Sequence, residues 1–430
     1  MFIKAFGKRV LSKFSSLLNA TTSPGILLLL APFFSKTEPY VCENVQKILV
    51  VDPYAIGDFV LSSPLLRELR VIFPSAKISV LLRHSANKQL AACCPYIDDV
   101  ILRDPSPLKQ GWPRWAWCLY CAKVALLELR RYRFDLAIYP YRGDDMYSAA
   151  LLYFSGARYR FGWAQPEDLK TRRRDSADVL YTNLIHSSQL LHEVESKLEF
   201  IKALGGTPTS DALEIWTNDV DERFATNFLS LGKHQRPLIA LGIGSARAKK
   251  QWTIEQYTEL AKWLVGTLEA NILLVGGAQD RGASNKIVQQ LPGRVINMVG
   301  STSIRQCAAL IRRCALFVGN DSAPKHMAAA YFIPVVEISC EPQFDRAGAQ
   351  LNSKINTRFR PWKTRHALVQ PTHAAAGCDT SCESEQPHCI AQVSLDAVKD
   401  AVIRMLAGET GGSEPVQAAT LLPNSVATSR

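Results

Sequence analysis

The stretch KILVVDPYAIGDFVLSSPLLRELRVIF, residues 47–73, decides the fold. It opens with a continuous aliphatic run, which is typical of a strand that is buried on both faces of a parallel sheet. A loop follows, and Ser62, Ser63 and Pro64 then mark the start of an apolar helix. Strand, loop and helix in this order predict an α/β domain with a parallel sheet.

The same alternation continues along the chain. Capping boxes at Thr253–Gln256 and Ser303–Gln306 predict two helix starts in the second half. A Trp-rich helical stretch is expected near 112–129. The other predicted strands lie within 77–82, 134–140, 236–246, 271–277, 315–321 and 333–339. The pattern predicts an α/β protein of two Rossmann-like domains, whose parallel sheets face a central cleft.

The chain is expected to have six parts, the fifth of which is a C-terminal helix. One face of this helix is apolar and holds Leu395, Val398, Val402 and Met405, and Gly408 ends it. The six parts are an N-terminal extension (1–45), a first domain (46–215), a linker (216–235), a second domain (236–393), a C-terminal helix (394–408) and a disordered tail (409–430).

Composition narrows the class of protein. The chain has 430 residues, 47% of them hydrophobic and 21% charged, as in an ordinary globular protein. Its net charge of +11 attracts anionic partners such as acidic lipid or phosphorylated substrates. Nucleic acid is not expected, because no basic face is interleaved with aromatic residues. The 11 scattered cysteines indicate a reducing compartment.

The N-terminal extension contains an apolar run at 25–34 that is too short to span a membrane. Lys4, Lys8, Arg9 and Lys13 precede it, which leaves three interpretations open. The segment is a basic amphipathic arm on an anionic membrane surface, a signal peptide that lacks a clear cleavage site, or a disordered extension.

The loops that follow the strands carry the candidate chemistry, because ligands bind at the carboxyl ends of strands in open α/β sheets. Asp58, beside Gly57, follows the first strand. A carboxylate in a cleft can act as a general base, and the adjacent glycine permits close approach of substrate. The alternative role for Asp58 is to complement the charge of a helix N-terminus.

Two loops of the second half expose groups that suit an anion. Backbone N–H groups of Gly244 and Ser245 can bind phosphate, and Lys249 or Lys250 can add a positive charge. Gly276 and Gly277 follow the next strand. Surface lysines in an ordinary loop are the alternative.

The segment GNDSAPKHMAAA, 319–330, combines a carboxylate with a helix start. Asp321 can accept hydrogen bonds from sugar hydroxyls, or serve as a plain helix cap. Ser322 can cap the helix and Pro324 lies in its first turn. His326 is a binding candidate rather than a catalyst.

Two further clusters stand outside these loops. Cys378, Cys382 and Cys389, with His388 nearby, form a candidate structural zinc site whose spacing fits no standard finger. A basic run holds Arg172, Arg173 and Arg174, which either contact anionic groups or lie in a solvated loop.

The ordered succession of these motifs resembles glycosyltransferase family 9, the ADP-heptose:lipopolysaccharide heptosyltransferases. Segments that carry the resemblance include 47–83, 134–163, HEVESKLEFIKALGG (192–206), AKKQWTIEQYTELAKWL (248–264) and 298–330, and it extends from Lys47 to Leu406. The resemblance implies a GT-B fold and an inverting transfer of heptose from a nucleotide diphosphate donor. It implies no required metal or other cofactor.

The resemblance also assigns roles to matching residues. Asp58 matches the general base for the acceptor hydroxyl, in a first domain that binds the acceptor at Gly57 and at Arg172 to Arg174. Lys250 matches the lysine near the donor phosphates, and Asp321 matches the aspartate that holds the donor sugar. The other implied donor-binding residues of the second domain are Gly244, Ser245, Gly276, Gly277, Ser322, Ala323 and His326.

Two differences from the family pattern keep alternatives open. The family usually shows His-Pro-Gly where this chain has Gly242-Ile243-Gly244, and glycine where it has Ala323. The expected enzyme acts on a lipid-anchored phosphorylated saccharide at the cytoplasmic face of the inner membrane, as a peripheral protein. The alternatives are a transferase with another donor or acceptor, and a noncatalytic glycan-binding relative.

Overall fold

The computed structural model describes residues 39–103, 120–143, 145–164, 177–230, 236–351, 353–378 and 384–408. The chain forms two compact units. The first extends to Asn218 and includes Thr357–Phe359, and the second comprises the remainder from Asp219 onward. The region expected as a linker, 216–235, contains a helix, α10 (Asp219–Ser230), which belongs to the second unit.

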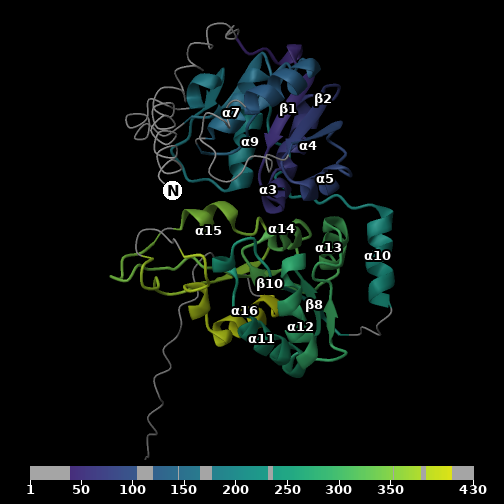
Figure 1. Ribbon diagram of the computed structural model, residues 1–430, viewed down its shortest axis with the longest axis vertical. Coiled ribbons are helices and arrows are strands. Elements are labelled where there is room, and N and C mark those ends of the chain that lie inside the picture. Colours follow the sequence, from purple (N-terminus) through teal and green to yellow (C-terminus); the bar gives the residue numbers. More distant parts are fainter. Residues whose placement is uncertain are drawn as a thin grey trace, which may run out of the picture. The chain divides into compact units, whose positions relative to one another are not determined.

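The first unit is built around one sheet of six strands (Figure 1). Its strands are β1 (Lys47–Asp52), β2 (Lys77–Leu82), β3 (Asp99–Leu102), β4 (Leu136–Ile138), β5 (Tyr159–Trp163) and β6 (Asn183–Ile185). Its helices are α3 (Ile56–Leu61), α4 (Ser63–Ile72), α5 (Ser85–Ala91), α7 (Met146–Phe154) and α9 (Glu193–Ala203).

All pairings in this sheet are parallel, in the order β3-β2-β1-β4-β5-β6. The order reverses direction between β1 and β4, and such a switch point places the loops after both strands beside each other. Leu49 and Val51 of β1 pack with Ala149 and Leu152 of α7, while Ile48 and Val50 are buried on the other face. Burial of both faces explains why β1 has no polar alternation.

The second unit repeats this plan. Its strands are β7 (Leu238–Gly242), β8 (Asn271–Val275), β9 (Val295–Asn297), β10 (Leu316–Asn320), β11 (Val335–Ile338) and β12 (His366–Val369). Its helices are α10, α11 (Ile254–Thr267), α12 (Arg281–Gln290), α13 (Ile304–Ile311), α14 (Ala323–Ala330), α15 (Lys354–Phe359, whose last three residues group with the first unit) and α16 (Leu395–Leu406).

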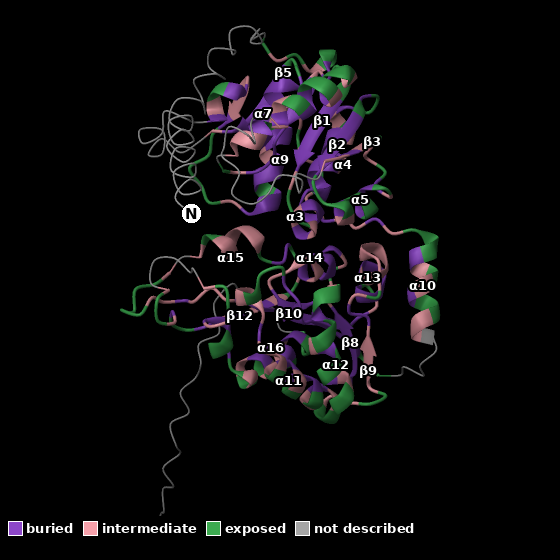
Figure 2. Cartoon of the chain, in the orientation of Figure 1, coloured by how far each residue is buried: buried purple, intermediate pink, exposed green. Residues whose placement is uncertain are grey.

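The strand order β12-β11-β10-β7-β8-β9 gives the same topology, with the switch point between β7 and β10. Gly242 and Gly319 are partners across these two strands, and the ring of Phe317 fills the space beside them. The core joins both central strands to one side of α11 and α16. Figure 2 shows the strands of this sheet largely buried, with exposed residues on the outer faces of the helices.

Most of the predicted elements are confirmed. β1 and β2 have the predicted bounds, β4, β7, β8, β10 and β11 lie within predicted stretches, and α16 ends before Gly408 as expected. Ser303 and Gln306 form the predicted capping box. Thr253 accepts from the Gln256 N–H. Near 112–129, the described part is a helical turn at 120–124 followed by a π-helical turn, η2 (Ala125–Leu129).

Within the described ranges, no helix is long and apolar enough to cross a bilayer. Most of the N-terminal extension and the tail from 409 lie outside those ranges. The predictions of a membrane-associated arm and of a disordered tail therefore concern residues that the structure does not describe.

The packing of α16 against the second sheet predicts a large difference between two neighbouring side chains. Met405 is 1% exposed and belongs to the core, whereas Leu406 is 38% exposed. We expect Met405→Ala to lower the free energy of unfolding of the second unit by about 2–5 kcal/mol, because it leaves a cavity. Leu406→Ala is the matched control, and calorimetry of the full chain measures both. Equal losses would contradict this assignment of the core.

Candidate functional site

The carboxyl end of β1 carries two carboxylates. Asp52 is the last residue of β1 and is buried, and Asp58 lies in the first turn of α3 beside the buried Gly57. Ser62 Oγ donates to Asp52 Oδ2 at 2.7 Å and lies 3.3 Å from the Tyr141 hydroxyl. Tyr141 follows β4, so these contacts join the loops on either side of the switch point.

A buried lysine balances these carboxylates. Lys197 Nζ of α9 donates to Glu193 Oε2 at 3.0 Å, and both side chains are 0% exposed. The same ammonium lies 4.1 Å from the centre of the Tyr141 ring. Arg358, in the part of α15 that groups with this unit, donates to Glu193 Oε1 at 2.7 Å from Nε. The cluster therefore holds three carboxylates, Lys197 and Arg358.

The cluster adjusts the acidity of Asp58. Burial raises the pKa of Asp58 to about 6, the positive charge of Lys197 opposes this rise, and the charges of Asp52 and Glu193 add to it. Burial also raises the pKa of Asp52. For Glu193, Lys197 and Arg358 outweigh burial and lower the pKa. A carboxyl group with a pKa near neutrality is suited to accept a proton from a hydroxyl group.

Arg142 adds a cation at the same edge of the sheet. It follows β4, its guanidinium lies 4.1 Å from the centre of the Trp163 ring, and Nη1 donates to the Gln189 carbonyl at 2.5 Å. Its Nε and Nη2 are buried and have no hydrogen-bond partner among the residues that the structure describes. A guanidinium presents two such nitrogens in the geometry that fits phosphate or carboxylate.

The second unit has its own charged cluster at the switch point. Asp321 follows β10, and Lys250 closes the short helix η5 (Ala248–Lys250) after β7. Lys250 forms an ion pair with Asp321. Lys325 Nζ of α14 lies 2.5 Å from Asp321 Oδ1 and 2.5 Å from Glu337 Oε1 of β11. Two lysines thus pair with two carboxyl groups, and Lys325 is only 1% exposed.

Asp321 and Lys325 keep their ionised forms in this cluster. For Asp321, burial alone would raise the pKa, but Lys325 and Lys250 outweigh it and hold the pKa well below its usual range. For Lys325, burial would lower the pKa, but Asp321 and Glu337 raise it. Burial raises the pKa of Glu337, and Lys325 only partly offsets that effect. Lys325 therefore stays charged.

Asn320 connects the two loops that carry Lys250 and Asp321. Its side-chain oxygen accepts from the Trp252 N–H at 3.0 Å and from the Tyr257 hydroxyl at 3.0 Å. Its amide nitrogen donates to the Ile243 carbonyl at 3.0 Å. These bonds fix the loop that carries Lys250 relative to the end of β10, so Asn320 positions both charged residues.

The predicted glycines surround a carboxylate. A side chain at Gly244 would overlap Asp280 Oδ2, and one at Gly276 would meet it at 3.0 Å. Asp280 Oδ2 accepts from the Gly277 N–H at 2.9 Å. The structure thus places Gly244, Gly276 and Gly277 around Asp280. Ser245 Oγ accepts from the Arg247 N–H in its own turn.

The helix start after Asp321 differs from the prediction in one respect. Pro324 lies in the first turn of α14 as expected, and His326 is buried. Ser322 occupies the N-cap position, but the prediction that its side chain caps the helix is wrong, because its hydroxyl donates to the Asn320 carbonyl. Ala323 begins the helix, whose first N–H groups therefore receive no side-chain cap.

Several predictions fall outside the described residues. Arg172, Arg173, Arg174 and Cys382 lie there. Cys378 and Cys389 are described, and they come together with His388. The sequence analysis missed Asp52, Lys197, Arg142, Lys325 and Glu337. These residues lie far apart in the sequence, so no local spacing signals that they form charged clusters.

Two solved structures that are similar to this chain show which fold it has. The glycosyltransferase family 9 protein of Veillonella parvula has a TM-score of 0.65 and 20% identity, and the match covers 85% of this chain and 98% of that one. The ADP-heptose LPS heptosyltransferase II of Escherichia coli has a TM-score of 0.61 and 21% identity, with 84% and 99% covered. The fold is GT-B, with two Rossmann-like units, as the sequence predicted.

The family follows from the sequence. The family model described as glycosyltransferase family 9 (heptosyltransferase) matches residues 126–366, more than half of the chain. This protein therefore belongs to glycosyltransferase family 9 and is a glycosyltransferase. The lipopolysaccharide heptosyltransferase 2 of Escherichia coli K12 is 27% identical over 314 residues, which cover 68% of this chain and 82% of that protein.

The close approach of Gly244 to Asp280 gives a steric prediction. We expect Gly244→Ala to lower the free energy of unfolding by about 1–3 kcal/mol, because the new methyl group displaces the carboxylate. Gly266→Ala in α11 is the control, since nothing lies within 4 Å of its added methyl group. That change should be neutral or stabilising by up to ~1 kcal/mol.

Calorimetry of both variants, and of Gly244→Ala combined with Asp280→Ala, measures the effect. The cost of Gly244→Ala should shrink once Asp280 is shortened. A cost that persists unchanged would show that another contact excludes the methyl group.

Proposed function

We propose that this protein transfers a heptose from ADP-heptose to the inner core of lipopolysaccharide, by an inverting mechanism in which Asp58 is the general base. The observation that carries the proposal is the carboxyl group of Asp58, whose pKa is about 6, at the switch point of the first sheet. Membership of glycosyltransferase family 9 and the heptosyltransferase relatives support the choice of heptose.

Asp58 acts on the acceptor. A sugar hydroxyl is a poor nucleophile, so the Asp58 carboxylate takes its proton as the oxygen attacks the anomeric carbon of the donor. The bond from that carbon to the diphosphate breaks in the same step, which inverts the configuration. Lys197 stabilises the ionised carboxylate before the reaction and loses part of that interaction as Asp58 is protonated.

The second unit stabilises the leaving group. Lys250 and the uncapped N–H groups at the start of α14 supply positive charge to the diphosphate as it gathers negative charge. Asp321, held by Lys325, accepts hydrogen bonds from hydroxyls of the donor sugar. Gly244, Ser245, Gly276, Gly277, Ser322, Ala323 and His326 complete the proposed donor site. This arrangement requires neither a metal ion nor another cofactor.

The acceptor in this proposal is a lipid-anchored phosphorylated saccharide. Arg142, with two unpaired nitrogens among the described residues, and the basic run at Arg172 to Arg174 suit its phosphate groups. Gly57 permits its approach to Asp58. The net charge of +11 favours an anionic membrane surface, and we place the enzyme at the periphery of the cytoplasmic face of the inner membrane. Nucleic acid has no role.

The first test compares wild type with Asp58→Asn in transfer from ADP-heptose to heptose-deficient lipopolysaccharide core. We expect kcat to fall by about 10²–10⁴-fold, because the amide cannot accept the proton. ADP binding should be unchanged, and Asp396→Asn, at a side chain that is 87% exposed, is the control.

Stability gives Asp58→Asn an independent readout. Because the folded state raises this pKa, ionising Asp58 costs stability as the pH rises from about 4 to about 6. The variant should therefore melt higher than wild type above pH 6. Unchanged transfer by the variant would remove Asp58 from the mechanism. If only another nucleotide sugar reacts, the heptose assignment fails and the fold class stands.

The pH dependence tests the neighbours of Asp58. We expect kcat/KM of wild type to fall below about pH 6, where the base becomes protonated. Asp52→Asn removes a negative neighbour that raises the pKa of Asp58, and its amide oxygen can still accept from Ser62. This acidic limb should move to lower pH in that variant. A limb that stays in place would assign it to another group.

Adjacent lysines test the donor site. We expect Lys250→Met to weaken ADP binding by about 10–100-fold, since a hydrogen bond to a charged group contributes about 1.5–3 kcal/mol. Lys249→Met is the matched control, because it removes the adjacent positive charge and leaves the Lys250–Asp321 ion pair in place. Isothermal titration calorimetry measures both. Equal effects of the two changes would indicate general surface charge instead.

A further inference from the structure

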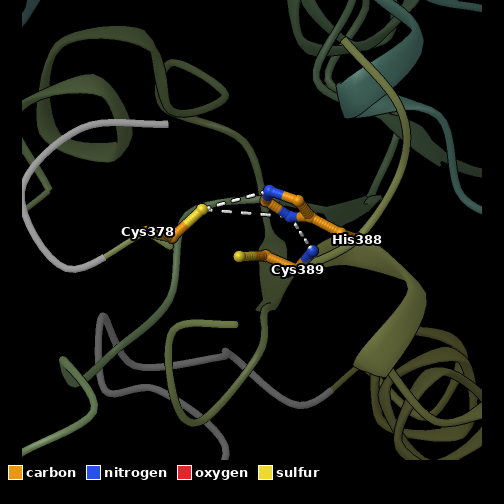
Figure 3. Close-up of side chains that lie close together, drawn as sticks. All are labelled: Cys378, His388 and Cys389. Carbon is orange, nitrogen blue, oxygen red and sulfur yellow. Dashed lines mark hydrogen bonds between the residues drawn. The ribbon is translucent and has the colours of Figure 1, made fainter. Parts of the chain in front are cut away.

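Three metal-ligating side chains meet in a part of the second unit that the transfer reaction does not use. Cys378 lies at the end of a turn that begins at Ala375, and His388 and Cys389 precede the short helix η7 (Ile390–Gln392). Figure 3 shows the three side chains close together, with the Cys378 sulfur facing the His388 ring and the Cys389 sulfur beside them. Nine residues lie between Cys378 and His388 in the sequence, so folding brings the two side chains together.

The distances suit a shared ion. Cys378 Sγ lies 3.1 Å from His388 Nε2, and one ligand atom from each of the three residues lies within 4.8 Å of the others. Zinc binds sulfur at about 2.3 Å and imidazole nitrogen at about 2.0–2.1 Å, so its tetrahedral ligands lie about 3.5–3.8 Å apart. Small side-chain rotations therefore bring all three atoms to coordination distance.

A backbone turn contacts the sulfurs of the cluster. Gly377 has a φ of +84°, and the Cys378 N–H donates to the Ala375 carbonyl at 3.1 Å, as in a type II turn. The same turn directs the Ala375 N–H to Cys389 Sγ at 3.4 Å. A backbone N–H that donates to a ligand atom helps to hold it in place, as groups around metal ligands do.

We propose that Cys378, His388 and Cys389 bind a structural Zn²⁺ ion. Each thiol releases its proton to solvent, the neutral imidazole binds through one ring nitrogen, and a further donor such as water completes the tetrahedron. Two sulfurs and one nitrogen favour zinc over the hard cations magnesium and calcium, which prefer oxygen. This site is separate from the proposed transfer chemistry.

The ion has a structural task in this position. Ile390 and Val393, directly after the cluster, belong to the core of the second unit. The Val393 carbonyl accepts from Trp252 Nε1 at 3.0 Å, and Trp252 follows the loop that carries Lys250. Zinc thus fixes the segment that supports this loop, and its removal lowers the stability of the second unit.

The test uses the full chain, purified under reducing conditions without a histidine tag, and measures metal by plasma mass spectrometry. We expect about one zinc ion per chain in wild type, as in a structural site. Cys378→Ser, His388→Ala and Cys389→Ser should each reduce zinc content at least tenfold. Cys340→Ser, in the same unit and outside the cluster, is the matched control and should keep its zinc.

A second measurement on wild-type protein tests the proposal even if the cysteine and histidine variants fold poorly. Wild-type protein is stripped with a chelator and titrated with Co²⁺, whose absorption reports thiolate ligands. We expect thiolate bands with wild type and Cys340→Ser, and recovery of the melting temperature when Zn²⁺ is restored. Wild type that takes up neither ion, that binds iron instead of zinc, or that forms a Cys378–Cys389 disulfide would overturn the proposal.

Discussion

In each sheet, the strand that comes first along the chain pairs in parallel with the strand that comes fourth. The rest of the structure depends on this pairing. β1 pairs with β4, and β7 pairs with β10. Because the sheet order reverses at these pairs, the loops that follow the two strands must meet. In the first unit this brings Asp58 and Tyr141 into one cluster, and in the second it brings Lys250 to Asp321. The chemistry is assembled from residues that are distant in sequence.

Both clusters keep charges buried, and they do so in different ways. In the second unit Lys250 and Lys325 both pair with Asp321, which holds the pKa of Asp321 well below its usual range and keeps it ionised. In the first unit Lys197 and Arg358 face three carboxylates, and Asp58 retains a raised pKa. A buried carboxylate whose negative charge is only partly offset by cations lowers the stability of the folded protein, and its raised pKa makes it a stronger base. The stability cost thus supports the proposed role of Asp58.

The sequence predicted those parts of the fold that have a strong local signal. Continuous apolar runs located β1, β2, β7, β8, β10 and β11, because central parallel strands are buried on both faces. β9 was missed, since it has three half-buried residues at the sheet edge. Lys325 could not be recognised, because a lysine in a helix is normally exposed and only the tertiary fold supplies Glu337. Asp58, Lys250 and Asp321 were predicted as site residues from their places in loops after strands and from the motif resemblance.

The stereochemistry of the product tests the mechanism most directly. The proposed mechanism is a single displacement, in which Asp58 activates the acceptor and no covalent sugar–enzyme intermediate forms. Proton NMR of the anomeric position, recorded early in a reaction of wild-type protein with ADP-heptose and a heptose-deficient acceptor, reads the new linkage. The mechanism predicts an anomeric configuration opposite to that of the donor. Retention of the donor configuration would contradict it.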